Sequence, residues 1–301
     1  MSHWFKHFGG AAALVALSAC STVGSAVAQP KAATLDPYNP QDAMQLARKM
    51  QCSTVDGEQA IFSWHGIAYA RRQGEKDVHL FDVIGMNTRS CSAIKDKNGD
   101  GFALVSREIL LYLDKDTGEV LDTWENPWTG ETVKVQQVEN DPVNFESYTV
   151  GRDGKPAIWS GEIQGDQWWY RSTFPLWYPS PLAGAYQTEV GGTYHATELF
   201  NFFGRTDDLL NPETTSAKVS VGWSRISDWL PWMKMNGREG IFYVHTAGAR
   251  LESWDDLPDV MKDYINTRAP LYKTPPQTGD PRDNRTSWQG YADFRNAQEK
   301  N

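Results

Sequence analysis

The sequence predicts an all-β protein whose strands form an antiparallel barrel, with a short N-terminal helix and one or two short C-terminal helices. Three observations lead to this prediction. Between about residues 58 and 250, apolar and polar side chains alternate with a period of two. Turn residues recur in that region every eight to fifteen positions. Few of the windows between these turns have the spacing of a helix.

The first thirty residues are typical of an export signal and not of a folded domain. A weakly positive start that contains Lys6 is followed by the apolar stretch Ala11–Leu17, which is too short to span a bilayer. The next residues, Leu17-Ser18-Ala19-Cys20, resemble a bacterial lipoprotein signal, which implies cleavage before Cys20 and lipid attached to its thiol. Two alternatives stay open: cleavage after Ala28 by an ordinary signal peptidase, or an uncleaved anchor.

This interpretation divides the chain into three parts. We expect residues 1–19 to be the lipoprotein signal peptide and residues 20–38 to be a small, polar, Pro-containing tether. Residues 39–301 are expected to form a single β-barrel-like domain.

The domain begins with residues that are typical of a helix start. Asn39 can cap the helix, and Pro40 suits its first position.

Besides Cys20, the chain has only Cys52 and Cys91. Two thiols in an oxidising compartment predict a disulfide, and two buried free thiols are the alternative.

The strands follow. They are expected near residues 60–64, 79–84, 103–113, 120–124, 132–138, 194–203, 217–225 and 241–246, with three more between residues 138 and 194. The segments 114–119 and 126–130 contain the glycines that tight reversals need. About ten strands must hide their edges, and closure into a barrel of calycin-like size does so most completely. A two-sheet sandwich is the alternative, but we favour the barrel, which can hold a small ligand.

Helical spacing returns after residue 250. Short helices are expected at 258–266 and from 288 to about 299. Residues 269–284 between them are rich in Pro and irregular.

Composition excludes some classes of protein. Apolar residues make up 40% and charged residues 22% of the 301 positions, which is ordinary for a globular chain and excludes a largely disordered or multi-span membrane protein. With 29 Lys and Arg against 38 Asp and Glu, the net charge is -9. Nucleic acid is not an expected partner, because binding a phosphate backbone needs a basic surface.

Tryptophan is the unusual part of the composition, with 13 residues. Any one of them can be explained as core, but the excess and its clusters predict a cavity lined by aromatic rings. The candidate ligand contacts are Trp128, Trp223, Trp229, Trp232 and Tyr194.

Four polar residues are candidates for catalysis. His245 and Glu198 could move a proton, since a strand can direct either side chain into a cavity. Arg225 and Arg107 could hold an anionic or oxyanion group. The alternatives are a satisfied strand histidine and structural ion pairs.

No metal or cofactor is expected. Residues 96–101 match the first six positions of a calcium loop, but its twelfth position is Arg107, so a hairpin turn is the preferred interpretation. The four histidines that remain after export are His65, His79, His195 and His245, and no metal-binding spacing links them. Phosphate loops and dinucleotide fingerprints are also missing.

Several ordered motifs resemble a known family. They are Ser106-Arg107-Glu108, Tyr112-Leu113-Asp114, Trp124 to Glu131, Asn140 to Val143, Glu198-Leu199-Phe200, Trp223-Ser224-Arg225, Trp229 to Met233 and Thr286-Ser287-Trp288. Together they are similar to domain-of-unknown-function family 1838, over most of the chain after about residue 40. The resemblance implies a shared β-rich fold. It implies no reaction and no catalytic residue.

We therefore expect an exported pocket protein that binds an apolar or aromatic small molecule in a Trp-rich cavity. It would be periplasmic, and it would meet the outer membrane only through a lipid on Cys20. The alternative is a cofactor-free isomerase, lyase or hydrolase that uses the same cavity for acid/base chemistry. A weaker third hypothesis is an envelope scaffold that binds proteins through an exposed aromatic patch.

Overall fold

The structure is a computed structural model. It describes residues 34–140, 144–180, 182, 186, 189–278 and 287–300, without the side chains of Ser287 and Gln289. The expected signal peptide, the lipidation site Cys20 and residues 20–33 of the tether lie outside the described residues.

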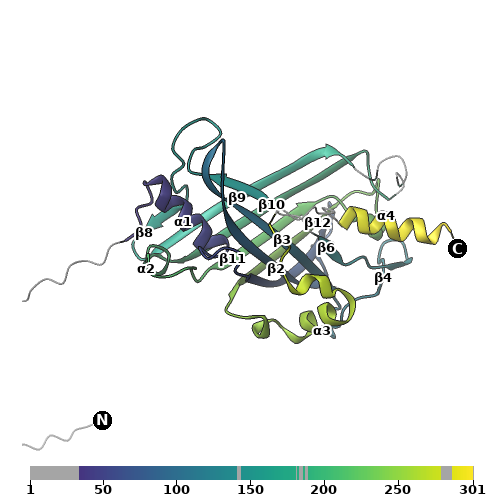
Figure 1. Ribbon diagram of the computed structural model, residues 1–301. Coiled ribbons are helices and arrows are strands. Elements are labelled where there is room, and N and C mark those ends of the chain that lie inside the picture. Colours follow the sequence, from purple (N-terminus) through teal and green to yellow (C-terminus); the bar gives the residue numbers. More distant parts are fainter. Residues whose placement is uncertain are drawn as a thin grey trace, which may run out of the picture. The chain divides into compact units, whose positions relative to one another are not determined.

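One large antiparallel sheet of ten strands is the main structural element of the described chain (Figure 1). Its strands are β1 (Ala60–Arg71), β2 (Val78–Asp96), β3 (Gly99–Leu113), β6 (Val138–Asn140), β7 (Phe145–Tyr148), β8 (Glu162–Gln164), β9 (Gln167–Pro179), β10 (Thr193–Arg205), β11 (Ser220–Ser227) and β12 (Ile241–Leu251). Their order is β6-β3-β2-β1-β12-β11-β10-β9-β8, and β7 also pairs with β3. A separate hairpin joins β4 (Thr123–Glu125) and β5 (Thr132–Lys134).

The predicted class of fold is confirmed, but the strand pairing does not describe a closed barrel. Among the described residues, no pairing joins β8 or β9 to β3, β6 or β7. The reason is that β8 covers only the start of β9, from Gln167 to Trp169. The two ends of the sheet nevertheless face one hollow, since Tyr112 of β3 and Tyr178 of β9 line the same cavity.

The N-terminal helix, α1 (Pro40–Gln51), begins where the sequence predicts. The Asn39 side chain accepts hydrogen bonds from the backbone N–H groups of Gln41 and Asp42, and Pro40 takes the first helical position. On its buried face, Leu46 and Met50 join the main apolar core. The helix packs against β3 and the four-residue α2 (Thr206–Leu209).

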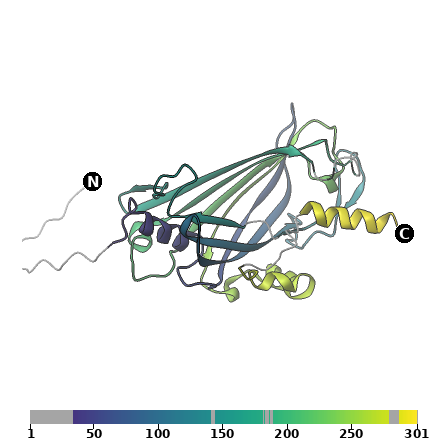
Figure 2. The same cartoon turned by 45° about the horizontal axis from the view of Figure 1, so that its top comes forward.

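Helices α3 (Asp259–Arg268) and α4 (Ser287–Gln298) bear out the expected C-terminal helices. Short 3-10 turns lie at η1 (Pro231–Met233), η2 (Trp254–Asp256) and η3 (Pro270–Lys273). In Figures 1 and 2, α4 lies toward the end of the sheet away from α1. None of the described helices is both long and apolar enough to cross a membrane.

Strand β3 is buried on both faces, and this divides the core in two. Ile109 and Leu111 pack with Met261 and Ile265 of α3 on one face. Leu110 and Tyr112 point the other way, into the main core. The second face is the one that surrounds the cavity.

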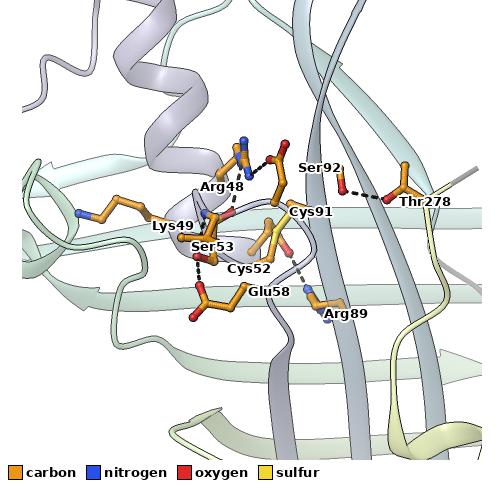
Figure 3. Close-up of a disulfide and its surroundings, with 12 residues drawn as sticks. Arg48, Lys49, Cys52, Ser53, Glu58, Arg89, Cys91, Ser92 and Thr278 are labelled. Carbon is orange, nitrogen blue, oxygen red and sulfur yellow. Dashed lines mark hydrogen bonds and ion pairs between the residues drawn. A yellow bond between two sulfur atoms is a disulfide. The ribbon is translucent and has the colours of Figure 1, made fainter.

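A disulfide joins Cys52, at the end of α1, to Cys91 in β2 (Figure 3). Beside it, Arg48 forms an ion pair of 2.8 Å with Asp56, and the Ser53 hydroxyl donates to Glu58. The bond ties the helix to the sheet across 39 positions of sequence.

The calcium-loop match is a hairpin turn between β2 and β3. Asp96 pairs with Gly99, and Gly99 has a φ of +102°, which suits glycine. The Asp96 carboxylate accepts a hydrogen bond from the backbone N–H of Asn98 and so serves the turn.

Candidate functional site

A cavity of about 320 Å³ lies between the concave face of the sheet, η1 and α4. Nine aromatic residues line it: Tyr112, Tyr178, Tyr194, Phe200, Trp223, Trp232, Phe242, Trp288 and Tyr291. Its polar lining residues are Glu108, Gln136, Asn140, Glu198 and Arg225. A wider groove beside β7 is more open, and its aromatic lining residues are Phe145 and Tyr148, so the candidate site is the aromatic cavity.

The alternation of each strand explains which side chains reach the cavity. On β3, Glu108, Leu110 and Tyr112 are two residues apart and share one face. On β10, Glu198 and Phe200 do the same. The remaining sheet walls come from β6, β9, β11 and β12, so the site needs strands from both halves of the sheet.

The arginine of the cavity has its charge compensated. Arg225 lies directly opposite Glu198 in the β10–β11 pairing, and its Nη1 is 3.2 Å from Glu198 Oε1. Its Nη2 donates to the Tyr194 hydroxyl. The side chains of Arg225 and Glu198 are 20% and 24% exposed. Burial disfavours the charge of Arg225, but the neighbouring Tyr194 and Glu198 outweigh it and raise its pKa.

The second carboxyl group of the cavity, that of Glu108, forms no ion pair with a described residue, and an amide is its hydrogen-bond partner. Asn87 Nδ2 lies 3.5 Å from Glu108 Oε2, and Asn87 in turn accepts a hydrogen bond of 2.7 Å from Arg89. Burial and the nearby negative charge of Glu198 raise the pKa of Glu108 to about 7. The cavity therefore contains a carboxyl group that changes its charge near neutral pH.

Tyr112 and Tyr178 keep their hydroxyl protons more firmly than an exposed tyrosine does. Burial raises the pKa of Tyr112 and of Tyr178 above the usual value. The Tyr178 and Tyr194 rings stack with centroids 4.9 Å apart, and Trp288 of α4 packs edge-on to Tyr194 at 4.9 Å. They give the cavity flat apolar surface with a few hydroxyl groups.

Three of the five expected ligand contacts line this cavity: Trp223, Trp232 and Tyr194. The other two do not. Trp229 lines a smaller neighbouring pocket of about 190 Å³. Trp128 packs between Trp229 and Trp124, with centroid distances of 5.3 and 6.4 Å.

Several tryptophans are core, as the alternative interpretation has it for any single one. Trp168 is fully buried, and the ring of Trp64 in β1 packs against Gly85 of the neighbouring strand β2. A Cβ placed on Gly85 would come within 2.1 Å of the Trp64 ring, so that position requires glycine.

Of the four catalytic candidates, the structure brings Glu198 and Arg225 together and separates the other two from them. His245 follows the cavity residue Val244 on β12, so its side chain is on the opposite, exposed face, where its Nδ1 lies 3.0 Å from Ser224 Oγ. The proposed acid/base role of His245 in this cavity is therefore corrected.

The assignment of Arg107 is corrected for the same reason. Arg107 precedes Glu108, so it lies on the other face of β3. There its Nη1 donates to the carbonyl oxygens of Leu271 and Thr274, at 3.3 and 3.0 Å. It holds the segment after α3 in place and cannot reach the cavity.

Sequence reasoning missed Glu108, Tyr112, Tyr178 and Trp288 as site residues. A signal for the first two was present, because period two places Glu108 and Tyr112 on one face. No local signal places Trp288 of α4 over strands from the middle of the chain.

The fold and the site define a class: an antiparallel β protein with an aromatic-lined cavity that holds two carboxyl groups and an arginine. Among the described residues, no group of His, Cys, Asp and Glu is arranged to hold a metal ion. The chain belongs to the family described as "Protein of unknown function (DUF1838)", which it matches over residues 57–295. This confirms the resemblance noted in its motifs. No curated protein matches the chain.

Proposed function

We propose that this protein binds an apolar or aromatic small molecule in the cavity between the sheet and α4. The observation that carries the proposal is the convergence of nine aromatic side chains on a space of about 320 Å³. Small-molecule sites are concave and mostly apolar, with a few placed polar groups. On this proposal, the curved sheet acts as an incompletely closed barrel around the ligand.

The polar groups would orient the ligand. Glu108, Glu198 and Arg225 all line the same cavity. Buried polar groups discriminate between ligands because a ligand without a matching group leaves them unpaired.

Tryptophan fluorescence tests the proposal. A library of hydrophobic aromatic compounds is titrated into the protein and into its W223F, W232F and W128F variants. We expect a saturable change in emission that W223F and W232F reduce. W128F is the matched control, since Trp128 is in the same aromatic region but does not line the cavity. Emission that responds to no compound, or that changes equally in all variants, would contradict binding in this cavity.

A second candidate function is acid/base catalysis on the same kind of molecule, and it is favoured by the pKa of about 7 at Glu108. A catalytic proton carrier works best when its pKa is near the working pH. Glu108 would transfer the proton, while Arg225 would stabilise developing negative charge. If a compound that binds is also converted, E108Q should abolish turnover and retain binding; turnover that survives in E108Q would exclude this role.

We also propose that the protein is exported and is held at the outer membrane by a lipid on Cys20. The support is the sequence Leu17-Ser18-Ala19-Cys20 after a short apolar stretch, and a Cys52–Cys91 disulfide, which suits an oxidising compartment.

A further inference from the structure

The charges in the cavity are not balanced. Arg225 is matched by Glu198, and two of its nitrogen atoms already donate hydrogen bonds. Among the described residues, Glu108 has no basic side chain within ion-pair distance. Its one hydrogen bond comes from an amide, Asn87, at 3.5 Å. With both carboxyl groups ionised, the cavity lining carries one uncompensated negative charge.

The groups that face Glu108 from the surrounding elements offset this charge in part and without an ion pair: Arg89 and Arg225 lower the pKa of Glu108, which burial and Glu198 still hold at about 7. Asn140 lies opposite it on β6, and Asn87 on β2 separates it from Arg89. The other strands and α4 contribute Glu198 and Arg225, which form their own pair. The other titratable or hydrogen-bonding side chains that they contribute are Tyr112, Tyr178, Tyr194, Tyr291 and Trp288.

The aromatic rings that line the cavity also favour a positively charged ligand group. The faces of aromatic rings are electronegative and attract cations within about 6 Å. Near the base of the cavity, the Tyr112 and Trp232 rings have centroids 5.4 Å apart at an interplanar angle of 61°, so they present surfaces in different directions. Tyr112 shares its strand face with Glu108, four residues away.

We propose that the ligand is an organic cation, an apolar or aromatic amine or quaternary ammonium whose positive group lies against Glu108 within the aromatic walls. This inference rests on the proposed function and specifies its ligand class. An anion is disfavoured because the Nη atoms of Arg225 already donate to Glu198 and Tyr194, and an anion would approach two carboxyl groups.

The proposal has a consequence for pH. A cation binds the ionised form of Glu108, whose pKa of about 7 means that about one tenth of the molecules are competent at pH 6 and about nine tenths at pH 8. Affinity for a cation of fixed charge should therefore rise about tenfold over that interval, with a proton released on binding.

The experiment compares benzyltrimethylammonium with neopentylbenzene, its uncharged counterpart of the same shape, and with the anion phenylacetate. Dissociation constants are measured at pH 6 and 8 by displacement of the neutral fluorophore N-phenyl-naphthylamine from the full chain. We expect benzyltrimethylammonium to bind at least about tenfold more tightly than neopentylbenzene at pH 8. E108Q should remove this preference and the pH dependence, whereas E139Q should keep both.

E139Q is the matched control. Glu139 lies beside β3 on β6 but on the other face, where it accepts a hydrogen bond of 2.8 Å from Tyr264. Equal affinity for the cation and the hydrocarbon, tighter binding of phenylacetate, or the same loss in E139Q as in E108Q would overturn the inference. If N-phenyl-naphthylamine binds and benzyltrimethylammonium does not displace it, the inference of a cationic ligand fails and the proposed function stands. If N-phenyl-naphthylamine itself does not bind, the proposed function fails with it.

Discussion

At the scale of single residues, the chemistry of the cavity depends on how each buried charge is compensated. Arg225 and Glu198 neutralise each other across neighbouring strands. Glu108 has only an amide partner, Asn87, and burial therefore disfavours its charged form.

The first prediction concerns stability and Glu108. Because its pKa rises from 4.5 to about 7 on folding, the folded chain retains a proton that the unfolded chain has lost. The free energy of unfolding should fall as pH rises from about 5 to about 7, by on the order of 3 kcal/mol from this group. E108Q should lack this contribution and be more stable than the wild type at pH 8. Urea unfolding of both proteins at pH 5 and 8 measures the difference, and an identical pH dependence in both would contradict the assignment.

The second prediction concerns the ion pair. R225M should lower the free energy of unfolding by about 3 kcal/mol, because it leaves Glu198 as an uncompensated charge in the cavity. The double variant R225M/E198Q should recover most of this loss, since no charge is then left without its partner. Denaturant unfolding of the single and double variants measures the coupling. Additive losses would show that the two side chains do not act as a pair.

The same residues show how much of the site could be predicted from sequence. Because successive side chains of a strand point to opposite faces, the sequence places Arg107 and Glu108 on different faces, and likewise Val244 and His245. It does not say which of the two faces lines the cavity. Both faces of β3 are buried, one by α3 and one by the cavity, so burial alone gives no answer. That choice depends on contacts across the whole sheet, which a local pattern does not contain.

At the scale of elements, local residue patterns predicted the helix start and the turn better than they predicted the site residues. The Asn39 cap and Pro40 define the start of α1, and the glycine at position 99 suits the reversal between β2 and β3. Barrel closure could not be predicted in this way. It would require pairing between strands such as β3 and β9, which are far apart in the chain, and no local residue pattern determines that pairing.

The third prediction tests the connection of α1 to the sheet. The Cys52–Cys91 bond closes a loop of 39 positions, for which the chain-entropy estimate is about 4 kcal/mol. C52S/C91S should lower the free energy of unfolding by about this amount, and reduction of the wild type should have the same effect. Thermal unfolding with and without a reductant measures it. A double variant as stable as the oxidised wild type would show that the bond is dispensable.

The fourth prediction concerns α4, which covers one side of the cavity. Tyr186 donates a hydrogen bond to Asn296, and Arg295 lies 3.0 Å from Glu189, whose side chain is only 8% exposed. N296A and R295M should each loosen this helix and increase amide hydrogen exchange in residues 288–298. Because Trp288 lines the cavity from α4, ligand affinity should fall as well.

The controls for this prediction are built into the same helix. Arg295 also donates to Gln298, which is exposed, so Q298A should leave exchange in α4 nearly unchanged. Exchange that is equally slow in R295M and in the wild type would mean that apolar packing alone holds α4.

At the scale of the whole molecule, two properties meet: a pocket that suits a hydrophobic ligand and an acidic surface. A net charge of -9 gives the chain no electrostatic attraction to anionic lipid, and no described helix could cross a bilayer. If the protein works at a membrane, where hydrophobic molecules accumulate, a covalent lipid is the attachment that its sequence offers.

The fifth prediction therefore concerns Cys20. C20S should move the protein from the membrane fraction to the soluble exported fraction, because it removes the lipid attachment site. None of the described helices could cross a bilayer, and the net charge of -9 disfavours binding to anionic lipid. Separation of the membrane and soluble fractions of cells that produce each protein measures the distribution. Ala28→Leu is the matched control, since it blocks the rival cleavage site and should leave the wild-type distribution unchanged. The reverse pattern, in which the wild type and C20S are both released and Ala28→Leu prevents release of the mature chain, would assign export to the ordinary signal peptidase instead.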